Sequence, residues 1–293
     1  MTESTIPNDN QALYLLGFSP KLTQLWTMDA SRTESASIES LDVQTALLLE
    51  QLGVEFLETG AVWAWFKRIE RCDFEGPVGE KNLADIHWLT PRVIAHETVV
   101  ARLSQQSAFY PARFGTLFST SERLSTYTDQ ASGRLVEFFD RVRGKCEWGM
   151  KLYGDTAQAA EIIAQRDGIL KEGKPAGGAN YLKLRQLQRE QSHFRTVFMA
   201  EAFETALRSL QSQFQEIVSR PLVVQGKDST REVLLGNLAL LANAPDSEHL
   251  ASWVKDWNSE RTLETGVRVE LTGPWPAYSF CPSLSAPAMK DAA

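Results

Sequence analysis

Histidine and cysteine are scarce in this chain, which has four histidines and three cysteines among its 293 residues. The histidines are dispersed and lack the ligand spacing of most metal sites. Cys72, Cys146 and Cys281 show no paired spacing that would indicate a disulfide framework or a zinc site. We therefore expect no metal, no cofactor and a reducing compartment, the cytoplasm.

Basic residues are fewer than acidic ones: the chain has 30 Lys and Arg residues and 37 Asp and Glu residues, and its net charge is −7. Nucleic acids and anionic lipid surfaces bind to basic faces, so we expect neither as a general partner. No apolar run approaches the roughly 20 residues that span a bilayer. Residues 1–10 contain no Lys or Arg, so we expect no secretory signal and no membrane association.

Catalytic motifs are missing as well, since the sequence contains neither a Gly-x-Ser-x-Gly elbow nor a Walker phosphate loop. Glu147 is the most conspicuous acid, because an adjacent indole, that of Trp148, can raise a carboxyl pKa. A single carboxylate is more typical of a structural salt bridge, for which Arg113 is a candidate partner. His96 lies on the apolar stripe of an expected helix that begins at Thr90, and we expect it to be a hydrogen-bonded core residue.

Aromatic residues, in contrast, are plentiful, and the chain has eight tryptophans. In an expected strand at 61–66, alternation places Trp63 and Trp65 on one side of the sheet and Val62, Ala64 and Phe66 on the other. If the sheet is covered on one side only, one of these sets is exposed as an apolar partner surface. These five residues are therefore our candidate partner surface.

A tract near the C-terminal end, residues 271–280, combines Gly273 with two prolines on either side of Trp275. Each proline fixes φ and removes a backbone donor, so the tract forms neither a helix nor a central strand. We expect it to close the edge of a second domain, with Trp275 and Phe280 packed against that domain's helices.

The order of expected elements predicts an α+β fold with two domains. The first, residues 11–118, has strands at 12–18, 54–58, 61–66 and 110–118 and a helix that begins at Thr90. The second, residues 119–281, has a helix at 121–143, a strand at 146–153, a second helix at 155–171 and a long helical run within 181–218. It continues with strands at 222–225, 232–241 and 267–271 and a helix at 246–260. We expect flexible termini at 1–10 and 282–293.

Three tracts of the sequence resemble the gas vesicle protein L/F family: Tyr110–Phe118, Lys145–Lys151 and Gly273–Phe280. They stand in the family's order and, with a strand at 14–17 and a His96–Glu97 pair, spread the resemblance over roughly residues 12–280. As structural motif residues the resemblance marks Arg113, Phe114, Gly115, Glu147, Trp148, Pro274 and Trp275.

The resemblance implies two ferredoxin-like domains, the second modified by a helical insertion that includes a long helix. It implies an accessory or minor structural protein of gas vesicle assembly, cytoplasmic and associated with the gas vesicle. The implied partners are the small hydrophobic shell protein A, bound through the first domain, and other accessory proteins; no catalytic residues are implied.

Two alternatives stay open, because a fold does not fix a function. One is a small-ligand-binding or enzymatic module on a ferredoxin-like scaffold, with a pocket near Glu147 and Arg113. The other is a regulatory scaffold that binds soluble proteins through the long helix.

Overall fold

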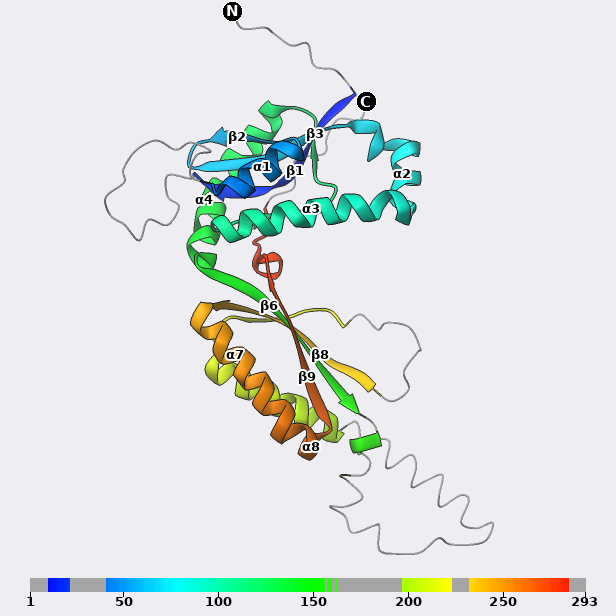
Figure 1. Ribbon diagram of the computed structural model, residues 1–293, viewed down its shortest axis with the longest axis vertical. Helices are drawn as coiled ribbons and strands as arrows, with labels where there is room; N and C mark the ends of the chain where they lie inside the picture. Colours follow the sequence, from blue (N-terminus) through cyan, green and yellow to red (C-terminus); the bar gives the residue numbers. More distant parts are fainter. Residues whose placement is uncertain are drawn as a thin grey trace, which may run out of the picture. The chain divides into compact units, whose positions relative to one another are not determined.

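Two antiparallel sheets organise this mixed α+β protein (Figure 1). The computed structural model describes residues 10–21, 41–155, 157–159, 162, 197–222 and 232–284. The chain divides into two compact units, which we call unit 1, residues 1–144 with 276–293, and unit 2, residues 145–275. Unit 2 is therefore an insertion into the chain of unit 1.

The sheet of unit 1 is centred on β1 (Gln11–Pro20), which pairs with β3 (Val62–Glu70) on one side. On its other side β1 pairs with two short strands, β4 (Tyr110–Pro111) and β5 (Leu117–Phe118). The edge strand β2 (Val54–Thr59) pairs with β3, and the two strands confirm those predicted at 54–58 and 61–66.

The tract that we predicted as one strand, residues 110–118, is instead a strand, a turn and a strand. Gly115 adopts a φ of +82°, in the left-handed region that favours glycine. Thr116 N donates to Arg113 O at 3.2 Å and closes the turn. Both short strands can therefore bond to β1, one on each side of the turn.

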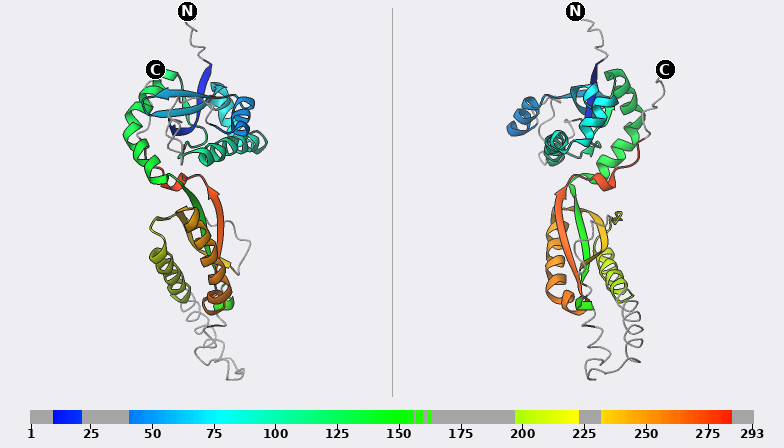
Figure 2. Two further views of the ribbon diagram at one scale, coloured as in Figure 1. Left: turned by 60° about the vertical axis from the view of Figure 1, so that its left-hand side comes forward. Right: turned by 90° about the vertical axis from the view of Figure 1, so that its right-hand side faces the viewer.

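Helices cover both faces of this sheet. In the right-hand view of Figure 2, α1 (Val43–Gln51) and α3 (Ile86–Gln106) lie on one side of the strands and α4 (Ser121–Val142) lies on the other. A short helix, α2 (Gly76–Ala84), precedes α3. Every β1 residue from Ala12 to Pro20 is buried, as a strand covered on both faces requires.

The position of α4 moves the division between the two units. We predicted a boundary at 118/119, whereas the structure keeps α4 in unit 1 and divides the chain at Gly144. The physical reason is the apolar stripe of α4, which packs on the first sheet. Its buried members are Leu124, Ala131, Leu135, Phe138, Phe139 and Val142.

The start of α3 also differs from the prediction. The helix begins at Ile86 instead of Thr90, because Asp85 caps it and accepts a 2.9 Å hydrogen bond from His87 N. Pro91 therefore lies inside the helix and not in its first turn, as a start at Thr90 would require.

Unit 2 is built on a four-stranded sheet in the order β7–β8–β6–β9. Its strands are β6 (Lys145–Asp155), β7 (Ile217–Ser219), β8 (Glu232–Asn243) and β9 (Val267–Trp275). The helix at 197–213 and α7 (Ala244–Asp256) pack on one face of it. Their shared core includes Met150, Leu152, Leu210, Leu238, Leu240, Trp253 and Val269.

The predicted long helix is confirmed only in part. Residues 197–213 are helical, but the helix ends before Val218, which belongs to β7. Several predicted segments lie mostly outside the described residues. They are the rest of the run at 181–218, the helix predicted at 155–171, the strand predicted at 222–225 and the termini at 1–10 and 282–293. The other predicted strands and helices of unit 2 are confirmed with shifted ends, α7 ending in a π-helical turn at Trp257–Arg261.

The two units share one strand order. The orders are β2–β3–β1–β4 and β7–β8–β6–β9. In each of them the strand that comes first in the chain lies between the third and the fourth, and the second lies at an edge. A helix follows the first strand and another precedes the last in each unit. The same plan therefore occurs twice in the chain.

Candidate functional site

The candidate partner surface at Val62–Phe66 is not a surface. Its five side chains are each no more than 3% exposed, because helices cover both faces of the sheet. Trp63 stacks on Phe56 at a ring-centre distance of 4.5 Å, and Trp65 Nε1 donates to Ser19 Oγ at 2.9 Å. These residues form the core of unit 1, and the expectation that one set is exposed was wrong.

Glu147 on β6 is fully buried and forms an ion pair with Arg220. The salt bridge that we expected is therefore present, but its cation is Arg220 and not Arg113, which lies in unit 1. Desolvation lowers the pKa of Arg220. The neighbouring Trp148 Nε1 donates to Ser247 Oγ at 2.9 Å, so this pair of motif residues has a structural role in unit 2.

The proline-tryptophan tract divides between the two units. Pro274 and Trp275 end the edge strand β9, and Trp275 is 52% exposed, so it is not buried against the helices of the second domain as we expected. Phe280 is buried, yet it belongs to unit 1, where the guanidinium of Arg141 lies 5.3 Å from its ring centre. The tract thus closes unit 1, while its tryptophan faces solvent.

The motif turn at Arg113–Gly115 holds one aromatic ring against the core. Phe114 lies edge-on to Tyr14 and to His96, with a ring-centre distance of 5.7 Å in each case. The side chain of Arg113 is exposed, and its backbone carbonyl accepts the turn hydrogen bond. We interpret the turn as the support of the Tyr14–His96 pair.

Tyr14 and His96 form a buried polar pair, as we predicted for His96. The Nε2 of His96 lies 3.2 Å from the carbonyl oxygen of Ala112, which can only accept, so Nε2 carries the proton. The other ring nitrogen, Nδ1, then accepts from Tyr14 Oη at 2.8 Å. Burial lowers the pKa of His96 and raises that of Tyr14, and both groups are therefore held neutral.

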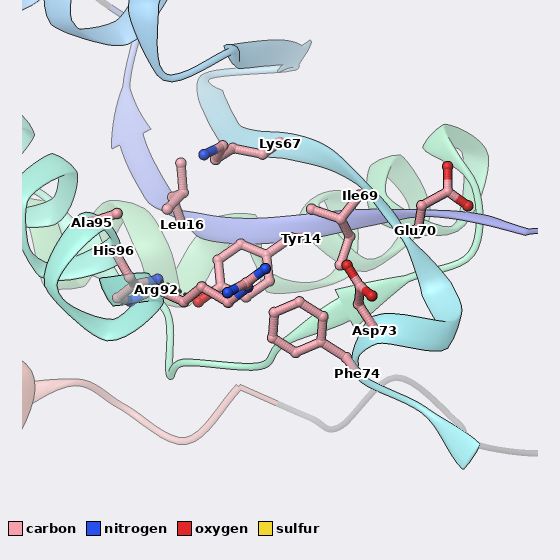
Figure 3. Close-up of a pocket in the computed structure, with 10 residues that line it drawn as sticks. All are labelled: Tyr14, Leu16, Lys67, Ile69, Glu70, Asp73, Phe74, Arg92, Ala95 and His96. Carbon is pink, nitrogen blue, oxygen red and sulfur yellow. Dashed lines mark hydrogen bonds between the residues drawn. The ribbon is translucent and has the colours of Figure 1, made fainter. Parts of the chain in front are cut away.

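A cavity of about 210 Å³ opens beside this pair (Figure 3). Strands β1 and β3, the turn after β3 and helix α3 supply its walls. The walls combine apolar residues with two cations and two carboxylates: Tyr14, Leu16, Lys67, Ile69, Glu70, Asp73, Phe74, Arg92, Ala95 and His96. Sequence analysis identified His96 but missed Lys67 and Arg92, because nothing in their local sequence indicates a shared cavity.

Two helices of unit 1 carry exposed aliphatic side chains. On α1, Val43 is 75% exposed and Leu47 is 52% exposed, and on α3 Ile86 is 64% and Ile94 is 60% exposed. Leu47 lines a shallow groove between α1 and α3 together with Thr98 and Ala101. We call Val43, Leu47 and Ile94 the helical apolar surface, which we did not predict because we assigned no element to residues 41–52.

No group of three or more His, Cys, Asp or Glu side chains in the described ranges could hold a metal ion. Within the same ranges no helix is both long enough and apolar enough to cross a membrane.

Comparison with known proteins links these observations to a family. The family model for "Gas vesicle synthesis protein GvpL/GvpF" matches residues 35–282. Gas vesicle protein L of Streptomyces sp. is 27% identical over 212 residues, which cover 71% of this chain and 75% of that protein. Gas vesicle protein L2 of Halobacterium salinarum is 24% identical over 213 residues, covering 68% of this chain and 74% of that protein.

Two crystal structures share the fold. Gas vesicle protein GvpF from Anabaena sp. aligns with a TM-score of 0.58 over 93% of this chain and 97% of its own, at 15% identity. GvpF from Microcystis aeruginosa aligns with a TM-score of 0.54 over 93% of this chain and 99% of its own, at 17% identity.

Proposed function

The chain belongs to the GvpL/GvpF family of gas vesicle synthesis proteins, and from this membership we propose that it binds the gas vesicle shell protein during assembly. The family match over residues 35–282 is the observation that carries the gas vesicle accessory role. The finer role, in which the protein carries the small hydrophobic shell protein A and contacts other accessory proteins, is our proposal.

We place the shell-protein contact on the helical apolar surface of unit 1. Val43, Leu47 and Ile94 expose aliphatic side chains, which a hydrophobic partner can cover. Leu47 lines the groove between α1 and α3, so a partner helix could lie against it. This contact replaces the buried strand at 62–66 as the candidate surface and keeps the interaction in the N-terminal part of the chain.

A pull-down with the shell protein tests the proposal. The variant Leu47→Asp/Ile94→Asp introduces charges at exposed positions, so unit 1 should fold while capture of the shell protein falls at least about tenfold. Leu263→Asp is the matched control, because Leu263 is an exposed leucine, at 73%, in unit 2. Undiminished capture by the double variant would overturn the proposed surface.

Deletion of the gene separates an assembly role from the alternatives. An assembly protein should be required for gas vesicles while the shell protein is still made. Normal gas vesicles in the deletion strain would instead favour a ligand-binding or enzymatic module, or a regulatory scaffold. Complementation with the Leu263→Asp variant should restore the vesicles, and complementation with the double variant should not.

We also propose that both units are ferredoxin-like. The shared order β2–β3–β1–β4 and β7–β8–β6–β9, with a helix after the first strand and before the last, supports this assignment. The structure of each unit expressed alone would test it, unit 1 as residues 1–144 joined to 276–293 by a short linker.

A further inference from the structure

We propose that the cavity beside Tyr14 is a binding site for a small carboxylate with an apolar body, such as an aryl carboxylate. The site is distinct from the helical apolar surface, and the inference does not depend on the shell-protein proposal. It rests on three features of the cavity: two cations that have no acidic partner among the described residues, an aromatic wall, and a volume that fits one ring.

The two cations reach the cavity from different elements. Lys67 comes from β3 and Arg92 from α3, and in Figure 3 Leu16 of β1 lies between them. Within the described ranges neither cation has a carboxylate at ion-pair distance. Burial lowers the pKa of Lys67, and a bound anion would offset that cost to its ammonium group.

Arg92 is held in position for this role. Its guanidinium lies 3.9 Å from the ring centre of Trp88, and its Nη1 donates to Trp88 O at 3.0 Å. Five N–H donors are available on a guanidinium, so the bond to Trp88 leaves others for a ligand. A carboxylate matches a guanidinium especially well, because its two oxygens can accept two parallel N–H···O hydrogen bonds.

The apolar body of the ligand would lie against aromatic and aliphatic side chains. Tyr14 and Phe74 form the aromatic wall, with ring centres 5.3 Å apart. Leu16, Ile69 and Ala95 complete the apolar part of the lining. Engineered apolar cavities of about 150 Å³ hold benzene. A cavity of about 210 Å³ therefore has room for one aromatic ring with a carboxylate attached.

The acidic residues of the lining restrict the charge of the ligand. Asp73 and Glu70 also line the cavity, and Figure 3 shows both on the side away from Lys67 and Ala95. Glu70 also accepts a 2.6 Å hydrogen bond from Asn10 Nδ2. A second negative charge on the ligand would face these carboxylates, so we expect a monoanion to be preferred over a dianion.

Binding of 4-fluorobenzoate to the full chain, followed by fluorine NMR, tests the site. We expect a dissociation constant on the order of 1 mM, as is typical of a small ligand with few heavy atoms. The neutral isostere 4-fluorobenzamide and the dianion 4-fluorophthalate should each bind at least about tenfold more weakly. Equal binding of the benzamide, or no binding of 4-fluorobenzoate at ten times the expected constant, would overturn the proposal.

Variants assign the binding to this cavity. Lys67→Met and Arg92→Met should each weaken 4-fluorobenzoate binding about tenfold or more, and Lys67→Arg should restore most of it. Lys81→Met, at an exposed position of α2, is the control and should bind as the parent chain does. Unchanged affinity of both cavity variants would show that the ligand binds elsewhere. The benzamide comparison uses the unaltered chain, so the proposal stays testable if a variant fails to fold.

Discussion

Tyr278 Oη donates a 2.9 Å hydrogen bond to Glu97 Oε1 and joins the C-terminal tract to helix α3. Two further hydrogen bonds link the residues just after this tract to unit 1. Tyr110 Oη donates to Pro282 O at 3.1 Å, and Arg134 Nη1 donates to Ser283 O at 2.8 Å. Residues 276–284 are thus part of unit 1, although the whole of unit 2 precedes them in the chain.

Truncation after Trp275 should therefore destabilise unit 1 and leave unit 2 folded. Loss of Phe280 alone removes a buried aromatic ring, worth about 3–5 kcal/mol in the free energy of unfolding. Hydrogen exchange measured by mass spectrometry should show faster exchange in β1 and β3 and unchanged exchange in β6 and β8. A chain that ends at Leu284 keeps the tract and serves as the control; equal protection of β1 in both truncated chains would contradict the prediction.

This arrangement explains why the sequence predicted the elements of unit 1 better than its extent. The strands at Gln11–Pro20 and Val62–Glu70 follow from short apolar runs, and the helix at Ser121–Val142 follows from helical spacing. The return of Phe280 to unit 1 depends on contacts between segments that are far apart in the chain, and local patterns contain no information on them. The error at Val62–Phe66 has the same origin, since assigning α4 to the second domain left one face of the first sheet uncovered.

Gly17 is the residue of β1 at which a side chain should be least tolerated. Its φ is +156°, and an added Cβ would lie 2.4 Å from Tyr110 O and 2.5 Å from the ring of Phe109. Gly17→Ala should lower the free energy of unfolding by about 3 kcal/mol, the upper part of the range for overpacking. Guanidinium unfolding followed by circular dichroism measures the change.

Gly133 provides the opposite case within the same unit. It lies in the interior of α4, and an added Cβ would meet no atom within 4 Å. Gly133→Ala should raise the free energy of unfolding by roughly 0.5–1 kcal/mol, because alanine loses less backbone entropy in a helix. If both substitutions changed the stability of unit 1 by the same amount, the steric reason given for Gly17 would be wrong.

The buried ion pair of unit 2 should be costly to break from one side. Arg220→Met removes the guanidinium that pairs with the fully buried Glu147, and we expect a loss of about 3–5 kcal/mol. The double variant Glu147→Gln/Arg220→Met should recover part of this loss, since no buried charge is left. Chemical unfolding of the parent chain, of Arg220→Met, of Glu147→Gln and of the double variant gives the coupling free energy between the two residues.

An exposed pair in the same unit is the control for this cycle. Arg261 and Glu264 contact each other at 3.0 Å, and both side chains are about 60% exposed. Arg261→Met should change the free energy of unfolding by less than about 1 kcal/mol. A loss as large as that of Arg220→Met would mean that burial does not set the cost.

Arg220 also shows how much of the candidate site the sequence could reveal. The expected salt bridge of Glu147 was correct in kind, because a buried carboxylate needs a counter-charge. Its partner depends on the register of β7 with β8 and of β8 with β6, which no single strand determines. Lys67 and Arg92 were missed for the same reason, since a strand and a helix bring them to one cavity.

The stability of unit 1 should fall as the solution is acidified, through His96. Burial lowers the pKa of His96 from its ordinary 6.5, so the unfolded chain takes up a proton at a higher pH than the folded chain does. The contribution of His96 is therefore complete above pH 6.5 and is lost as the pH falls toward the folded pKa, by at most about 1.4 kcal/mol per pH unit. Chemical unfolding at a series of pH values from about 7 to about 5 measures the slope. His96→Gln should flatten it, whereas His87→Gln, at an exposed position of the same helix, should not. An unchanged slope in His96→Gln would assign the acid sensitivity to other groups.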